Sequence, residues 1–237
     1  MNSKAIIHPH CSSCEARYKS VFCDLNNADL DVLDVAKSCG SYKKGQTIFN
    51  EGTRPQGIFC VNSGKIKVFK TGDDGKEQIL RLEKEGSILG YRSLLCGDTY
   101  SATGTAIEES KICFIPKSTF LSILDCNSAL AFQMMKLLSH DLRNAEERIT
   151  TLAQKPVRER LAEVLLFVKE TYGLEADGAT MSVILTREEL ANIVGTATET
   201  LIRLLADFKH ENLIELEGKR IRLLDQKALL NLANIHD

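Results

Sequence analysis

Short stretches in which apolar and polar residues alternate occupy the first half of the chain and predict β-strands. They read QTIFNEG, GIFCVNSG, KIKVFK, EQILRLEKEG and SKICFIP, between residues 46 and 116. Ten of the fifteen glycines fall between Tyr42 and Pro116, and the segment TGDDGKE has the composition of a hairpin turn. Glycine is favoured there because it tolerates positive φ. Many short strands at this spacing predict an antiparallel β-barrel or jelly roll.

A different apolar spacing follows Pro116 and predicts one long helix. No Gly or Pro occurs from Asp125 to Lys155. Because charged residues flank a narrow apolar stripe, we expect a dimerisation helix; a helix packed within one subunit is the alternative. The stripe has the alternating steps of three and four that are typical of a coiled-coil seam: Met135, Leu138, Leu142, Ala145, Ile149 and Leu152.

The chain after Pro156 predicts two further helices in tandem. VRERLAEVLLFVKETYG reads as a helix that ends at Gly173, and LEADGATMSVIL reads as a turn-rich hairpin. Thr186 and Glu189 have the spacing of a capping box at the start of the helix REELANIV.

A tight turn at Gly195 and a second helix complete a predicted helix-turn-helix. We expect Thr196 or Thr198 to cap this second helix. LIELEGKRIRLLD then reads as two short strands around Gly218, which is the β-wing of a winged helix.

The outer face of the second helix carries candidate base contacts. A recognition helix presents its N-terminal residues to base edges in the major groove. Arg203 can bind guanine O6 and N7, and Glu199 can accept a hydrogen bond from cytosine N4. Thr198 and Ile202 lie on the same predicted face. A surface salt bridge on an ordinary amphipathic helix is the alternative for Glu199 and Arg203.

Basic residues beside this helix are candidate phosphate contacts. They are Arg187 on the first helix and Lys219, Arg220 and Arg222 on the wing. Solvated surface charge is the alternative for each. The formal net charge is −2, so bulk charge by itself gives no indication of nucleic acid.

Composition is that of a soluble globular protein, with 43% hydrophobic residues among 237. The N-terminal MNSKAIIHPH lacks the apolar segment of a secretion signal, and the run VLLFV is too short to cross a membrane. We therefore expect a cytoplasmic protein. The histidines are scattered and no nucleophile motif occurs, so we do not expect an enzyme.

These patterns together resemble the CRP/FNR family of transcription regulators. The resemblance rests on GIFCVNSGKIKVFK, GKEQILRLEKEGSILGYRSLL, SKICFIPKSTF and TREELANIVGTATETLIRLL, which occur in the family's order. It implies an α+β fold with an N-terminal cysteine-containing segment (1–26), a β-barrel sensor domain (27–124), a dimerisation helix (125–155) and a winged helix-turn-helix (156–237). It also implies a homodimer on pseudo-palindromic double-stranded DNA, with RNA polymerase as a further partner.

The cyclic-AMP branch of the family suggests one effector that this chain should not bind. That branch holds the ribose with a Gly-Glu pair and the cyclic phosphate with an Arg-Ser pair. The matching positions here are Gly90–Tyr91 and Tyr100–Ser101. Without the Arg, the phosphate loses a charge-assisted bidentate contact, so cyclic AMP is not expected. Binding of another small molecule inside the barrel remains an alternative.

The FNR branch suggests a metal centre, because its members carry an iron–sulfur cluster on cysteines. Cys11, Cys14, Cys23 and Cys113 could supply four thiolates to a [4Fe–4S] cluster or to zinc. Ser20 occupies the place of the family's third cysteine. Cys23 and Cys113 could instead be buried thiols.

Three functions therefore remain at this stage. The first is a DNA-binding regulator controlled by redox state or a metal centre. The second is a regulator with another effector or none. The third is a cyclic-nucleotide-domain protein that does not bind DNA, which the winged helix-turn-helix argues against.

Overall fold

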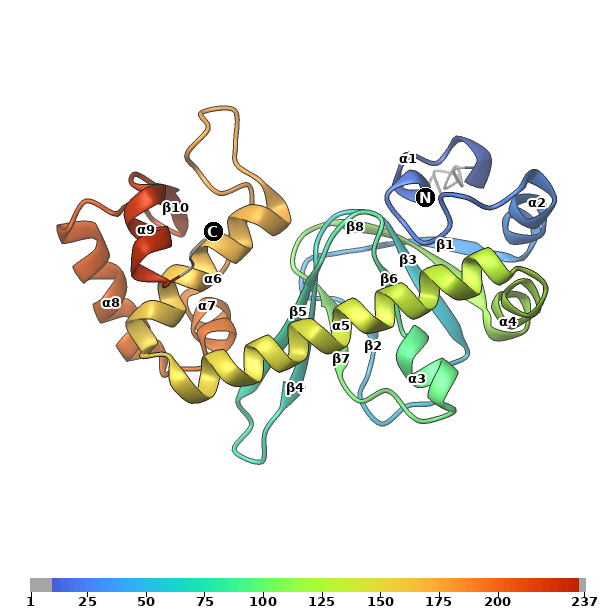
Figure 1. Ribbon diagram of the computed structural model, residues 1–237, viewed down its shortest axis with the longest axis horizontal. Coiled ribbons are helices and arrows are strands. Elements are labelled where there is room, and N and C mark those ends of the chain that lie inside the picture. Colours follow the sequence, from blue (N-terminus) through green and yellow to red (C-terminus); the bar gives the residue numbers. More distant parts are fainter. Residues whose placement is uncertain (1–9, 235–237) are drawn as a thin grey trace, which may run out of the picture. The chain divides into compact units, whose positions relative to one another are not determined.

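A computed structural model describes residues 10–234 of the chain (Figure 1). The chain divides into two compact units, and the division falls inside its longest helix. Of the described residues, 10–70 together with 81–143 form the first unit, and 71–80 together with 144–234 form the second. Within residues 10–234, no helix is both long enough and apolar enough to span a membrane.

Eight strands form two antiparallel four-stranded sheets in the N-terminal half. The first sheet has the order β1-β8-β3-β6 and the second has the order β2-β7-β4-β5. The strands are β1 (Ser38–Tyr42), β2 (Thr47–Phe49), β3 (Gly57–Ser63), β4 (Ile66–Thr71), β5 (Glu77–Glu83), β6 (Ile88–Leu89), β7 (Thr103–Ala106) and β8 (Ser110–Pro116).

The two sheets correspond to the predicted jelly roll, and they do not close into a barrel. Each of the five predicted runs contains a strand. Three strands have no counterpart in the prediction: β1, β6 and β7. β6 has only two residues, and β1 has no fully buried position, so neither carries the alternation that identifies a strand. An apolar cluster that includes Phe49, Ile66, Val68 and Tyr100 packs the interior.

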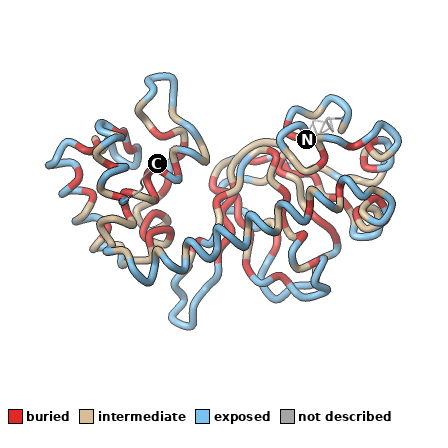
Figure 2. The backbone as a smooth tube through the Cα atoms, in the orientation of Figure 1, coloured by how far each residue is buried: buried red, intermediate tan, exposed pale blue. Residues whose placement is uncertain are grey.

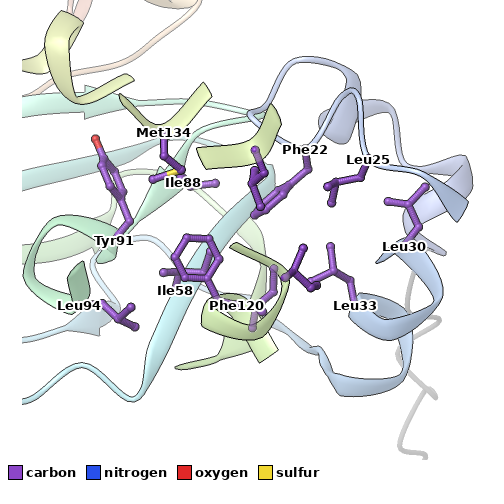
Figure 3. Packing of buried hydrophobic residues seen from close by; sticks show 13 residues of the cluster. Phe22, Leu25, Leu30, Leu33, Ile58, Ile88, Tyr91, Leu94, Phe120 and Met134 are labelled. Carbon is purple, nitrogen blue, oxygen red and sulfur yellow. The ribbon is translucent and has the colours of Figure 1, made fainter. Parts of the chain in front are cut away.

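A second apolar cluster joins the N-terminal segment and several helices to the first sheet (Figure 3). The cluster consists of Phe22, Leu25, Leu30, Leu33, Ile58, Ile88, Tyr91, Leu94, Ile115, Phe120, Ile123, Leu130 and Met134. The helices are η1 (Cys11–Ser13), α1 (Glu15–Tyr18), α2 (Asn27–Ala36), α3 (Tyr91–Cys96), α4 (Lys117–Cys126) and the start of α5 (Ser128–Gln154). Burial of these side chains therefore fixes the cysteine-rich N-terminal segment against the sheet.

The long helix predicted after Pro116 is present as α5, and its apolar stripe is largely exposed in the single chain (Figure 2). Met135 is 56%, Leu142 59% and Ile149 67% exposed. Leu138 is the exception, because it packs partly against the second apolar cluster. A stripe of this kind leaves apolar area in water unless another surface covers it.

The C-terminal part forms the predicted winged helix. It consists of α6 (Val157–Tyr172), α7 (Arg187–Val194), α8 (Thr198–His210), β9 (Ile214–Glu217), β10 (Arg220–Leu223) and α9 (Gln226–Leu232). The capping box is confirmed, since Thr186 accepts from the Glu189 N–H and the Glu189 side chain accepts from the Thr186 N–H. The predicted threonine cap on α8 is wrong: the N-cap is Ala197, which has no side-chain hydrogen-bond acceptor.

Candidate functional site

The turn between α7 and α8 begins at Gly195, whose φ of 73° lies in the left-handed region. The last carbonyls of a helix lack partners inside the helix, and here an arginine satisfies them. Arg160 donates through Nε to the Val194 carbonyl at 3.1 Å and through Nη2 to the Gly195 carbonyl at 3.0 Å. Its Nη1 also donates to the carbonyls of Leu152 and Lys155, both at 3.2 Å. One guanidinium thus connects the turn to the segment that precedes α6.

Helix α8 buries one face and exposes the other. Its inner side chains, Leu201, Leu205 and Phe208, are at most 1% exposed. On the outer face, Glu199 and Arg203 are exposed and Ile202 is 52% exposed. Thr198, the first residue of α8, is half-buried.

The wing, formed by β9 and β10, belongs to the same unit as α7 and α8. It carries three of the predicted phosphate contacts: Lys219, Arg220 and Arg222. β9 and β10 pair antiparallel, with Arg220 opposite Glu217. Lys219 and Arg220 are exposed at its turn. Arg222 is also exposed, but its guanidinium lies 3.5 Å from the Glu215 carboxylate, which offsets its charge.

Arg187 has a different environment from the other predicted phosphate contacts. Its Nη2 donates to the Gly218 carbonyl at 2.8 Å, so it holds the wing turn against the start of α7. Its Nη1 is buried and has no hydrogen-bond partner among residues 10–234. Burial lowers the pKa of this guanidinium. Sequence reasoning did not anticipate this positioning role, because the wing and α7 are thirty-one residues apart.

In the first unit, the two tyrosines that the resemblance matches to the cyclic-AMP ligand positions are buried. Tyr91 is 1% and Tyr100 6% exposed. The Tyr100 ring packs at a tilt of 34° against the Phe49 ring, with centroids 4.5 Å apart, and also lies close to Gly90. Burial raises the pKa of Tyr100 to about 12, so its hydroxyl is neutral at physiological pH.

Tyr91 connects the sensor fold to α5. Its hydroxyl donates to the carboxylate of Asp141, and the Arg81 guanidinium lies 3.4 Å from the same carboxylate. Burial and the hydrogen bond to Asp141 raise the pKa of Tyr91. Arg81 also lies 3.5 Å from Glu83, whose pKa burial raises. Asp141 directly precedes Leu142 of the exposed stripe, so this polar network ends at the predicted dimer surface.

Three charged residues hold the N-terminal cysteine segment: Asp34 of α2, the α2 C-cap Lys37, and Arg17 of α1. The Asp34 carboxylate accepts from the Cys11 N–H at 2.8 Å and from the Lys37 ammonium. Burial opposes ionisation of Asp34, but these hydrogen bonds outweigh it and lower its pKa to about 2. Arg17 donates to the carbonyls of Cys11 and Cys23 at 2.9 and 2.7 Å.

The predicted set of four metal ligands is not assembled in the structure. Cys113 on β8 is joined by a disulfide to Cys39, which lies directly opposite it on β1. Cys23 is a free thiol, and burial followed by a hydrogen bond with Asp24 raises its pKa. Within residues 10–234, no three His, Cys, Asp or Glu side chains are arranged to hold a metal ion.

A cavity of about 50 Å³ nevertheless lies between the N-terminal segment and the first sheet. Its lining includes the free cysteines Cys11, Cys14 and Cys60, the disulfide-bonded Cys113, and Ser20, whereas Cys23 is not among the lining residues. Burial raises the pKa of Cys60, and negative charge on Cys11 and Cys14 raises it further. Sequence reasoning missed Cys60 and Cys39 because only strand pairing brings them beside Cys113.

Comparison with known proteins agrees with this two-part architecture. A model of the cyclic nucleotide-binding domain matches residues 40–127, and a model of the Crp-like helix-turn-helix domain matches residues 159–232. The chain is 30% identical to the transcriptional activator protein FnrA of Stutzerimonas stutzeri, over 94% of this chain and 92% of that protein.

Two solved structures extend the comparison. FixK2 from Bradyrhizobium japonicum superposes with a TM-score of 0.76 at 23% identity, covering 85% of this chain and 99% of that one, and it supports the fold alone. A CRP/FNR family regulator from Thermus thermophilus has a TM-score of 0.72 at 25% identity, covering 84% and 100%.

The fold and these relatives define a DNA-binding regulator of transcription. The chain belongs to the CRP/FNR family of transcription regulators.

The arginine that holds the turn gives a test of stability. Arg160→Ala should lower the free energy of unfolding by about 2–3 kcal/mol, because it removes charge-assisted hydrogen bonds and leaves helix-end carbonyls without their donor. Urea unfolding followed by circular dichroism measures this. Arg222→Ala, which breaks only exposed ion pairs, is the control and should cost less than about 1 kcal/mol. Equal losses for the two variants would contradict the role assigned to Arg160.

Proposed function

We propose that this regulator binds, as a homodimer, a pseudo-palindromic DNA site that its two α8 helices read in adjacent major grooves. The observation that carries the proposal is the two-sided character of α8. Leu201, Leu205 and Phe208 are buried, while Glu199, Ile202 and Arg203 are left on the free face. An α-helix fits the major groove, where each base pair presents a distinct set of donors and acceptors.

The residue types on α8 specify which bases it prefers. Arg203 has the fork that binds guanine O6 and N7, and Glu199 can accept from cytosine N4 of a neighbouring pair. Thr198 can offer only a hydroxyl or a methyl group, and Ile202 can make only apolar contact. The methyl group of Thr198 and the side chain of Ile202 both suit contact with the thymine methyl group. The family's shared Glu–Arg pair implies a G-A-type core in each half-site, and Thr198 and Ile202 predict thymine, not guanine, opposite their part of the helix.

Phosphate contacts come from the wing in this proposal. Lys219 and Arg220 are exposed at its turn and have room to reach the DNA backbone. Arg187 is a weaker candidate as a direct contact, because one arm of its guanidinium is engaged with Gly218. Its contribution to DNA binding is then to hold the wing turn.

The dimer is formed by the exposed stripe of α5. Pairing two copies would remove Met135, Leu142 and Ile149 from water, which is favourable at about 25 cal/mol per Å² of apolar area. The two recognition helices would then lie one helical turn of DNA apart. We place this regulator in the cytoplasm, acting through DNA and RNA polymerase and not through catalysis.

The DNA proposal predicts a defined loss when its main base contact is removed. Arg203→Ala should cost roughly 1–3 kcal/mol of binding free energy per half-site and relax the preference for one guanine. Selection of bound oligonucleotides from a random pool, with fluorescence anisotropy on the selected site, measures both effects.

Lys219→Ala is the matched control for that experiment. It should weaken binding to all sequences alike and reduce the slope of log affinity against log salt by about one for each phosphate that the lysine no longer neutralises. Selected sites without two-fold symmetry, or an unchanged motif for Arg203→Ala, would contradict the assignment of α8.

The dimer proposal predicts that a charge in the seam separates the subunits. Leu142→Glu would place two like charges opposite one another in a low-dielectric interface, so the variant should sediment as a monomer. Asn144→Glu adds the same charge two residues away, outside the stripe, and should remain dimeric. A monomeric unmodified protein under both oxidising and reducing conditions would refute the seam.

The effector proposal is that cyclic AMP is not the ligand. Tyr91 and Tyr100 are buried where the related branch has a carboxylate and a guanidinium, so the Tyr100 position supplies no charge-assisted contact to a cyclic phosphate. Titration calorimetry should show no saturable heat with cyclic AMP at micromolar concentration, while the same sample binds its DNA site. Saturable heat would show that the tyrosine-filled region opens to the nucleotide.

A metal-dependent regulator is the second candidate. The ligands predicted from the sequence are Cys11, Cys14, Cys23 and Cys113, as a [4Fe–4S] cluster or zinc site. The observation that favours this candidate is the cavity, which is lined by Cys11, Cys14, Cys60 and the disulfide-bonded Cys113 and not by Cys23.

A further inference from the structure

We infer that Gln78 of β5 and Arg148 of α5 are positioning residues for DNA recognition, because they hold the end of α7 and, through the turn that follows it, the start of α8. The inference rests on the proposed role of α8 in reading DNA. It assigns no DNA contact to either residue, since both act on the backbone of the helix-turn-helix.

Side chains from outside the helix-turn-helix bind four consecutive carbonyl groups, those of residues 192–195, at the end of α7. Such carbonyls have no donor within their own helix. Arg160 binds the last two of them. Gln78 donates through Nε2 to the Asn192 carbonyl at 2.6 Å. Arg148 donates through Nη2 to the Ile193 carbonyl at 2.5 Å. Every carbonyl of this turn therefore depends on a side chain that is remote in sequence.

Arg148 binds β5 as well as α7. The same Nη2 donates to the Ile79 carbonyl at 3.1 Å, so one nitrogen connects the residue after Gln78 to the end of α7. Ile79 is only 1% exposed and Arg148 is half-buried, which shields these hydrogen bonds from water. Burial lowers the pKa of Arg148. A guanidinium nevertheless stays protonated at physiological pH, so the donor is always present.

The segment that carries Gln78 belongs to the DNA-binding unit. Residues 71–80, the tip of the hairpin formed by β4 and β5, group with the second unit, although both strands are part of the second sheet. β5 begins in the second unit and continues into the first. The end of α7 is therefore bound to a strand that leads directly into the sensor fold.

Two side chains also restrict the turn itself. A Cβ atom placed on Gly195 would lie 2.8 Å from Cδ2 of Leu152 on α5 and 3.7 Å from Oε1 of Gln78. The turn therefore packs closely against α5 on one side and lies near the hairpin on the other. Displacement of either element would move Gly195, and α8 begins three residues later.

Charge shows that the hairpin tip also lies near the start of α8. A hydrogen bond to Asp74 raises the pKa of Lys76, and the Glu199 carboxylate raises it further. Glu199 lies in the first turn of α8 and is one of the two proposed base contacts. The hairpin tip thus neighbours both the end of α7 and the start of α8.

Base recognition depends on this arrangement more than phosphate binding does. The two hydrogen bonds from the Arg203 fork to a guanine require the fork to be held within about 0.5 Å of its correct place. Phosphate contacts from the wing position the protein without reading sequence. Loss of the Gln78 or Arg148 hydrogen bonds should therefore reduce affinity for the selected site and leave affinity for unrelated DNA almost unchanged.

The test measures DNA binding by the full-length Gln78→Ala variant with fluorescence anisotropy. Binding to the selected site should weaken by about 10-fold, because each subunit of the dimer loses a hydrogen bond. Binding to an unrelated duplex of equal length should change by less than about twofold. Gln46→Ala is the matched control: Gln46 is exposed, accepts locally from the Lys43 N–H, and should bind both duplexes as the parent does.

A double-mutant cycle separates positioning from general stability. In an Arg203→Ala background, Gln78→Ala should weaken binding by less than about twofold, because the fork that it positions is absent. Arg148→Met is the second variant and should reproduce the loss seen with Gln78→Ala. Its control is Arg143→Met, which removes the same charge from an exposed site on α5 outside the apolar stripe. Circular dichroism verifies that each variant is folded.

Three results are decisive against the inference. Equal affinity of the parent and both variants for the selected site would remove the positioning role. Equal losses on selected and unrelated DNA, or an undiminished loss in the Arg203→Ala background, would show that these residues only stabilise the unit. Failure of the unchanged protein to select any two-fold symmetric site would instead refute the proposed function, and the inference with it.

Discussion

The arrangement of the DNA-binding unit depends on the turn that starts at Gly195. Two helices can meet there only if the chain reverses within a few residues, which requires a left-handed residue and donors for the carbonyls at the end of α7. Arg160 supplies those donors from the first turn of α6, and the same guanidinium donates to the carbonyls of Leu152, in the last turn of α5, and Lys155, just after it. The orientation of α8 therefore depends on a residue outside the helix-turn-helix itself.

The jelly roll of this chain resembles that of the cyclic-AMP branch, but the side chains in its interior are different. Tyr100 packs against Phe49 and lies close to Gly90, where a nucleotide phosphate would require a cation. Tyr91 instead reaches Asp141 on α5, together with Arg81. A structural change around α3 would therefore alter the hydrogen bond from Tyr91 to Asp141, the residue that directly precedes Leu142 of the exposed stripe. This gives a physical route from the sensor fold to the proposed subunit interface.

Strand pairing brings three cysteines of the first sheet next to one another. Cys39, Cys113 and Cys60 lie in one row across β1, β8 and β3. Cys113 can therefore bond to one neighbour or join the other beside Cys11 and Cys14 at the cavity. Such a row can respond to oxidation, because the disulfide forms from the thiolate of Cys113 or Cys39.

The sequence by itself determined the elements whose signals are local. The spacing of apolar residues identified α5, the Thr186–Glu189 capping box located the start of α7, and glycine composition marked the turns of the jelly roll. The outward residues of α8 also follow from its period, because a helix buries one face whatever it packs against. The tertiary structure decided what depends on contacts distant in sequence. It placed Cys60 at the cavity, paired Cys113 with Cys39 and engaged Arg187 with Gly218. No spacing along the chain encodes these contacts, because strand register and wing folding set them.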